Sequence, residues 1–289
     1  MILITRFAVA ATAMGMLTAC ALGGDGSPGG SNDARTDGKV IATTSIWADV
    51  TSAVLCGVPV TPLIPAGADP HTFEPSLRDR TLVELADALV TNGAGLDGSL
   101  ADLIGAAATT VDLADSIDLI DGDPHFWQDP LRVADAATTI AAAVAASGVP
   151  TCEDDYIAQL VELDRDIASM LAQVPDNTRV MVTSHDSLEY FADRYGIEII
   201  GTVIPSTTTL AETNAADLAA LAQLIDERNV RVIFTEQLES SSDADALAQR
   251  LGVDIVPLVT DALTDDPGTD TYIGMMRSNA TAIAQALAP

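Results

Sequence analysis

The sequence predicts an α/β protein with two lobes, each containing a mostly parallel sheet flanked by helices, joined by one long rigid helix. Three observations lead to this prediction. Short β-branched runs alternate with amphipathic helical stretches from Lys39 onward. The alternation stops once, where helical stretches at about 130–146 and 153–173 follow each other without a strand. It then restarts and continues through the rest of the chain, so two lobes are expected.

The first lobe is predicted to contain four extended segments. The run after Lys39 reads as a strand, and Ser45 is placed to cap the helix that follows it. Pro59 and Pro62 lie in the second segment and favour an edge position, because proline cannot donate a ladder hydrogen bond. The strands are expected at 40–44, 58–64, 88–91 and 109–113, and further helices at 77–86 and 99–107.

The stretch 153–173 carries apolar residues at helical spacing, and at about 1.5 Å per residue it is roughly 30 Å long. That length is enough to cross a whole domain. The second lobe follows, with strands expected at 179–183, 197–203, 230–235 and 254–259, and helices at 187–195, 211–228, 243–251 and 271–288. The predicted divisions are an N-terminal lobe at 39–150, a linking helix at 151–174 and a C-terminal lobe at 175–289.

The first 38 residues have the pattern of an exported lipoprotein. Arg6 precedes a short apolar run, which is typical of a signal peptide rather than a membrane span. The run ends in Leu17-Thr-Ala-Cys20, which resembles a bacterial lipobox, so we expect a signal peptide at 1–19 and lipidation of Cys20. An ordinary secretory signal is the alternative. Residues 20–38 are rich in Gly, Ser and Asp and predict a flexible tether to the extracytoplasmic face of a membrane.

Two cysteines remain once Cys20 is set aside. Export to an oxidising compartment favours a disulfide between Cys56 and Cys152. Two unrelated buried thiols are the alternative, and the sequence leaves both open.

The charge balance excludes one class of partner. The chain has 13 Lys and Arg against 42 Asp and Glu, a formal net charge of −29. No basic footprint for nucleic acid can be assembled from so few cations. A field of this sign would raise the local concentration of cations. The favoured explanation of the acidity is simpler, namely solubility or a compositional habit of the lineage.

The three histidines and one aspartate are expected at the same kind of position. His71, His125 and His185 each follow a predicted strand, and Asp261 directly follows the last one. Ligand-binding groups of open parallel sheets lie just past the carboxyl ends of strands. Three imidazoles and a carboxylate suit Zn²⁺, and also Mn²⁺.

His71 and His125 share an Asp-Pro prefix, which presents each imidazole from a stiff loop. Asp69 and Asp123 are candidates to accept a hydrogen bond from the non-ligating ring nitrogen of the histidine that each precedes.

Several segments resemble the zinc/manganese solute-binding lipoproteins of bacterial ABC transporters. They are Ala68-Asp-Pro-His-Thr-Phe-Glu-Pro-Ser76, Asp123-Pro-His-Phe-Trp-Gln-Asp-Pro130, Ser184-His-Asp-Ser-Leu-Glu-Tyr-Phe-Ala-Asp-Arg-Tyr-Gly196 and Ile233-Phe-Thr-Glu-Gln237. The resemblance runs from Lys39 to the last residue. It implies that His71, His125, His185 and Asp261 bind the metal, that Glu236 supports the site without ligating, and that the partner is a membrane permease.

The resemblance also implies a non-enzymatic protein, which we expect to be monomeric. Many zinc-specific members carry a His-rich loop between the first two ligand histidines, but residues 72–124 contain no histidine, which keeps manganese open. One alternative is an extracytoplasmic zinc hydrolase with Glu74 as general base. It is disfavoured because there is no His-Glu-x-x-His helix or nucleophile elbow, and because Asp261 would close the coordination sphere. A second alternative is an adhesin-like surface lipoprotein with a structural metal.

Overall fold

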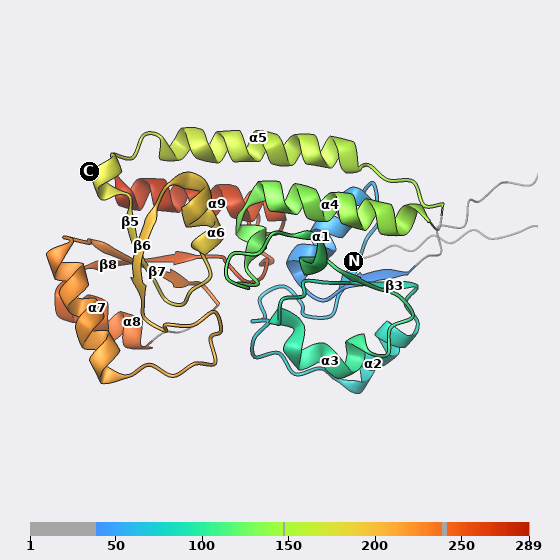
Figure 1. Cartoon of the computed structure of the whole chain (residues 1–289), viewed down its shortest axis with the longest axis horizontal. Helices are drawn as coiled ribbons and strands as arrows, with labels where there is room; N and C mark the ends of the chain where they lie inside the picture. Colours follow the sequence, from blue (N-terminus) through green and yellow to red (C-terminus); the bar gives the residue numbers. More distant parts are fainter. Residues whose placement is uncertain (1–38, 147, 239–241, 289) are drawn as a thin grey trace, which may run out of the picture. The chain divides into compact units, whose positions relative to one another are not determined.

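The computed structural model describes residues 39–146, 148–238 and 242–288. Within them, two four-stranded parallel sheets form the centres of two lobes, and helices flank both sheets (Figure 1). This confirms the predicted fold class. The signal peptide, Cys20 and the tether lie outside the described residues. Among the described residues, no helix is both long enough and apolar enough to cross a bilayer.

The sheet of the first lobe has the strand order β2-β1-β3-β4, so the proline-containing strand β2 is an edge strand, as predicted. Pro59 precedes β2 and Pro62 ends it. The strands are β1 (Val40–Ala42), β2 (Thr61–Pro62), β3 (Ala88–Thr91) and β4 (Thr110–Asp112), and the helices between them are α1 (Ser45–Val54), α2 (Leu77–Glu84), the 3₁₀ helix η1 (Leu96–Leu100) and α3 (Ala101–Ile104).

Two local predictions in this lobe were wrong. Thr44, not Ser45, caps α1, because the Thr44 hydroxyl accepts the N–H of Trp47 at 3.2 Å while Ser45 is already helical. The helix expected at 99–107 is broken into η1 and the short α3. Gly98 lies within η1 and Gly105 directly follows α3, and glycine destabilises a helix.

Two 3₁₀ turns, η2 (Ala114–Ser116) and η3 (Phe126–Gln128), lead into α4 (Pro130–Ala145) and α5 (Glu153–Leu171). Asp129 caps α4 by accepting the N–H of Leu131, and Pro130 occupies a position where no N–H is needed. The first turn of α5 holds three acidic residues, which interact favourably with the helix dipole. Helix α5 packs against α4 and α9 and is the long helix that the sequence predicts between the lobes.

The second sheet has the order β6-β5-β7-β8. Its strands are β5 (Val180–Thr183), β6 (Glu198–Thr202), β7 (Val232–Glu236) and β8 (Asp254–Leu258), and its helices are η4 (Asp176–Thr178), α6 (Glu189–Tyr195), α7 (Ala215–Glu227), α8 (Ser242–Leu251) and α9 (Tyr272–Leu287). Helix α7 starts four residues later than predicted, because Asn214 caps it by accepting the N–H groups of Ala216 and Asp217.

One apolar core runs through both lobes. It includes Ala42 and Val90 of the first sheet, Met181 and Phe234 of the second, and the buried faces of α4, α5 and α9. Such a shared core couples the lobes, because separating them would expose apolar surface to water.

A disulfide joins Cys56, just after α1, to Cys152, at the start of α5. The N–H of Cys152 also donates to the carbonyl of Val54 at 2.8 Å. The beginning of the linking helix is therefore attached to the first lobe.

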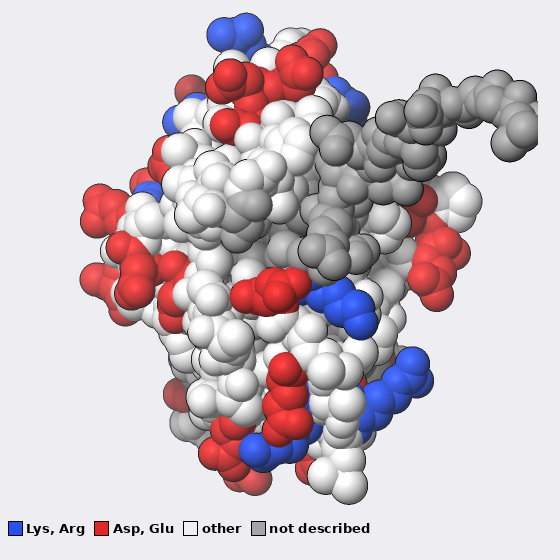
Figure 2. Space-filling view, turned by 90° about the vertical axis from the view of Figure 1, so that its right-hand side faces the viewer, with Lys and Arg blue, Asp and Glu red and all other residues white. Residues whose placement is uncertain are grey.

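On the face shown in Figure 2, acidic side chains are scattered and the few basic ones form no continuous patch.

Candidate metal centre

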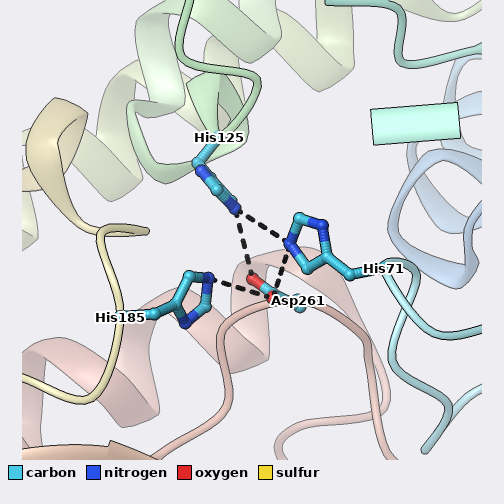
Figure 3. A group of neighbouring side chains, drawn as sticks. All are labelled: His71, His125, His185 and Asp261. Atoms are coloured by element: carbon cyan, nitrogen blue, oxygen red, sulfur yellow. Dashed lines mark hydrogen bonds and ion pairs between the residues drawn. The ribbon is translucent and has the colours of Figure 1, made fainter. Parts of the chain in front are cut away.

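The structure brings the three histidines and Asp261 together between the lobes. His71 follows β2 and His125 precedes η3 in the first lobe, while His185 follows β5 and Asp261 follows β8 in the second. Figure 3 shows the four side chains pointing toward one another. One potential ligand atom from each lies within 4.8 Å of all the others. The shared position past the carboxyl ends of parallel strands is the reason that residues up to 190 positions apart converge.

All three imidazoles present Nε2 to the centre of the cluster. The Nε2 atoms of His71 and His125 are 3.4 Å apart. The carboxylate of Asp261 lies 3.5 Å from Nε2 of His71, 3.6 Å from that of His185 and 4.0 Å from that of His125. His125 and His185 are fully buried and Asp261 is 3% exposed, so the cluster is shielded from water.

Two of the imidazoles are oriented by a carboxylate on the far side of the ring. His125 Nδ1 lies 2.6 Å from Oδ1 of Asp123, and His185 Nδ1 lies 2.8 Å from Oε1 of Glu236. The Ser187 hydroxyl donates to the same Glu236 oxygen at 3.1 Å. A carboxylate can only accept, so the Asp123 contact places the proton of His125 on Nδ1 and leaves its Nε2 lone pair facing the cluster. The ion pair with Glu236 favours the same arrangement at His185. Asp123 and Glu236 thus have the supporting geometry expected of them.

Asp69 behaves differently from Asp123. Both aspartates accept the backbone N–H of the histidine two residues later, at 2.8 Å for Asp69 and 3.0 Å for Asp123. This Asx turn is the shared role of the Asp-Pro-His pattern. The remaining oxygen of Asp69 accepts the hydroxyls of Thr72 and Thr209, so the expected contact of Asp69 with the His71 ring was wrong. The hydroxyl of Thr209, from the second lobe, donates to the Asp69 carboxylate instead.

Asp261 keeps its negative charge in this environment. Burial raises the pKa of its carboxyl, but the contact with His71 and the charges that His185 and His125 carry when protonated outweigh burial and lower that pKa to about 2. The cluster therefore offers imidazole nitrogens and one ionised carboxylate, which is a donor set for a divalent transition metal.

The segment that holds Asp261 is fixed by the segment that holds His125. The carbonyl of Thr260 accepts hydrogen bonds from Trp127 Nε1 at 2.8 Å and from Gln128 Nε2 at 3.1 Å. The hydroxyl of Tyr272 donates to the Trp127 carbonyl at 2.7 Å. In the sequence, Trp127 and Gln128 were recognised only as part of a family pattern, and their hydrogen bonds to the Thr260 carbonyl were not predicted. The one available signal was their position directly after His125.

The backbone before His125 is held by two further residues that sequence reasoning did not identify. Asn92 Nδ2 donates to the carbonyl of Pro124 at 3.1 Å, and the Tyr190 hydroxyl donates to the carbonyl of Asp123 at 2.7 Å. Burial raises the pKa of Tyr190 to about 12, which keeps the phenol protonated and able to donate. These contacts fix the imidazole of His125 through its own main chain.

The structure does not support the hydrolase alternative. Glu74, the general base in that hypothesis, is exposed and is not a member of the buried cluster. A catalytic zinc site keeps an open coordination position beside its acid or base. The four-residue cluster instead resembles a closed site suited to holding an ion.

Comparison with known proteins gives a consistent picture. The family model of zinc-uptake complex component A, periplasmic, matches residues 40–286. The zinc-binding protein TroA of Treponema pallidum is 27% identical over 310 residues, which cover 98% of this chain and 98% of TroA. The manganese-binding lipoprotein MntA of Bacillus subtilis is 29% identical over 296 residues, covering 92% of this chain and 95% of MntA.

The solved structure of periplasmic zinc-binding protein TroA from Treponema pallidum superimposes with a TM-score of 0.79 at 26% identity, over 86% of this chain and 99% of that one. The match therefore extends over both lobes. These findings confirm the resemblance seen in the sequence: the chain belongs to the family of periplasmic component A of zinc-uptake complexes, the metal-binding solute-binding proteins of ABC transporters.

Proposed function

We propose that this protein captures Zn²⁺ between its lobes through His71, His125, His185 and Asp261 and delivers it to the membrane permease of an ABC transporter. The observation that supports the proposal is the convergence of four donor atoms, two from each lobe, on three buried residues and the half-buried His71. Four ligand atoms arranged tetrahedrally at about 2.0–2.2 Å from Zn²⁺ lie roughly 3.3–3.6 Å from one another. The His71–His125, His71–Asp261 and His185–Asp261 separations of 3.4, 3.5 and 3.6 Å fall in that range, and one ligand atom from each of the four residues lies within 4.8 Å of the others.

The donor set favours zinc over manganese. Three imidazoles and a single carboxylate match the nitrogen-rich, four-coordinate sites of Zn²⁺, whereas Mn²⁺ suits carboxylate, carbonyl and water oxygens. Manganese is the alternative cargo, since one of the relatives is a manganese-binding lipoprotein.

We further propose that the protein is a lipid-anchored monomer on the extracytoplasmic face of the membrane. The support is the pattern Leu17-Thr-Ala-Cys20 after a signal-like run, and the lipoprotein name of the Bacillus subtilis relative. In this scheme residues 1–19 are removed, residues 20–38 are the tether, and the lobes span 39–150 and 175–289 on either side of the linking segment 151–174.

The proposal is tested by metal titration of chelated, metal-free protein. Zn²⁺ is expected to raise the melting temperature, with about 2.7 kcal/mol of added stability when free zinc exceeds Kd 100-fold, and Mn²⁺ is expected to bind more weakly. His71→Ala combined with His185→Ala is expected to abolish the zinc-induced shift. Unchanged zinc affinity in that double variant would contradict the ligand assignment.

The chain offers a matched control for the carboxylate ligand. Asp261→Asn is expected to weaken zinc binding, whereas Asp265→Asn, at an exposed aspartate four residues later, is expected to leave it unchanged. Equal losses in both variants would show that the general negative charge of the segment, rather than ligation by Asp261, supports binding.

A further inference from the structure

The loop that carries His71, residues 65–73, is the outer wall of the metal centre, and we call it the His71 loop. The His71 side chain is 6% exposed, against 0% for both other histidines and 3% for Asp261. Within the loop Thr72 is exposed, and Asp69 and Phe73 are half-buried. An ion that enters or leaves the cluster therefore has its shortest route to water past His71.

The other two imidazoles are fixed more firmly. His125 and His185 are each oriented through Nδ1 by a carboxylate of their own lobe, Asp123 and Glu236. At His71, the aspartate two residues earlier is bound to the backbone N–H instead of the ring. The position of the His71 imidazole consequently depends on where the loop itself is held.

The His71 loop is held to the second lobe at two points. The Gly67 N–H donates to the carbonyl of Leu263 at 2.8 Å, two residues after Asp261. Nearer to His71, the hydroxyl of Thr209 donates to Oδ2 of Asp69 at 2.9 Å, across a separation of 140 residues. Thr209 belongs to the segment between β6 and α7, so this hydrogen bond connects the His71 loop to the second lobe.

We propose that the Thr209–Asp69 hydrogen bond is a latch that holds the His71 loop over the bound ion and sets the rate at which the ion leaves. The inference rests on the proposed function, because it assumes that His71 is a ligand. Asp69 connects His71 to the second lobe. Its Oδ1 accepts the backbone N–H of His71, and its Oδ2 accepts the hydroxyl of Thr209. Thr209 is thus a positioning residue that acts on the metal through Asp69 and His71.

A charge-assisted hydrogen bond at this place should affect release more than capture. The Asx turn is local to the loop, since the His71 N–H and the Thr72 hydroxyl both bind Asp69, and it does not depend on contact with the second lobe. The latch forms only when the loop closes on the second lobe, so its energy stabilises the closed, loaded form. Affinity differences of this kind appear mainly in the dissociation rate.

The experiment compares zinc dissociation rates by stopped-flow mixing of zinc-loaded protein with excess chelator. Thr209→Val, which keeps the side-chain shape and removes the hydroxyl, is expected to accelerate dissociation roughly 5- to 20-fold with little change in the association rate. Thr209→Ser is expected to restore the wild-type rate. Thr208→Val is the matched control, because the Thr208 hydroxyl accepts the N–H of Leu210 within its own segment.

Each outcome distinguishes the latch from the proposed function. A wild-type protein that takes up no zinc would refute the function itself. A wild type that binds zinc and a Thr209→Val variant that releases it at the same rate would refute the latch alone. The latch is also refuted if Thr208→Val accelerates release as much, or if Thr209→Ser fails to restore the rate. Melting curves of the metal-free variants establish that each is folded.

Discussion

Glu236 shows how a residue that does not face the ion can determine how strongly the ion is held. It ends β7 and is 7% exposed, and its Oε1 atom lies 2.8 Å from His185 Nδ1. A carboxylate at this nitrogen fixes the ring orientation and makes the opposite nitrogen a stronger electron donor. The Ser187 hydroxyl holds the carboxylate in turn, so the contact is itself oriented.

We predict that Glu236→Gln lowers zinc affinity by about 10-fold. The glutamine oxygen can still accept from Nδ1, so the substitution removes the charge and keeps the shape. Isothermal titration with a competing chelator measures the change. Glu198→Gln is the control, because Glu198 is exposed and pairs with Arg228 on the surface. An unchanged affinity in Glu236→Gln would show that the charge of Glu236 has no effect on the ligand.

At the residue scale, the candidate ligands could be predicted from the sequence, but the residues that position those ligands through hydrogen bonds could not. His185 and Asp261 could be placed because parallel strands bring their carboxyl ends to one edge. Asp69 could not be assigned correctly, because its partner Thr209 is 140 residues away and lies beside it only in the folded chain. Asn92 and Tyr190 bind backbone carbonyls, for which no residue pattern exists.

At the element scale, the strands were predicted more reliably than the starts and ends of the helices. Extended, β-branched-rich segments located each strand that the structure describes, although β2 comprises only Thr61–Pro62 of the predicted 58–64. Helix starts depend instead on single caps. Thr44 and Asn214 determine where α1 and α7 begin, and each has polar neighbours in the sequence that are equally suitable as caps.

The contact between α1 and α5 leads to a prediction about the disulfide. Helix α1 starts at the carboxyl end of β1 and runs back along the sheet, so Cys56 lies at the opposite end from the metal centre. The bond closes a loop between residues 96 positions apart. Replacing Cys56 and Cys152 by serine is expected to lower the free energy of unfolding by about 3 kcal/mol, with zinc affinity unchanged.

Denaturant melts of the serine variant and of wild type, with and without reductant, test this prediction. Reductant should destabilise the wild type and leave the variant unaffected. If the variant loses zinc affinity as well as stability, the disulfide supports the metal centre and not only the junction of α1 and α5. If it loses neither, the bond has no measurable role in the folded protein.

At the scale of the whole molecule, the two lobes are joined by hydrogen bonds near the metal centre and by the packing of α9 against α1 and α5. Trp127 of the first lobe donates to Thr260 of the second, and Tyr190 of the second donates to Asp123 of the first. Helix α9 packs against both α1 and α5, and one apolar core continues through both sheets. A wide opening would break these buried hydrogen bonds and expose the core, each at a cost in free energy.

We therefore predict that loading with zinc changes the His71 loop and not the arrangement of the lobes. Small-angle X-ray scattering of the metal-free and zinc-loaded protein should give radii of gyration that agree within error. Hydrogen exchange should show greater protection on loading in residues 65–73 and 203–214, which carry the two sides of the latch, while the amides of α4, α5 and α9 stay equally protected. A clear decrease in the radius of gyration on loading, or new protection spread along α5, would show that the lobes swing about the linking helix. That result would mean that the cross-lobe hydrogen bonds described above form only in the loaded protein.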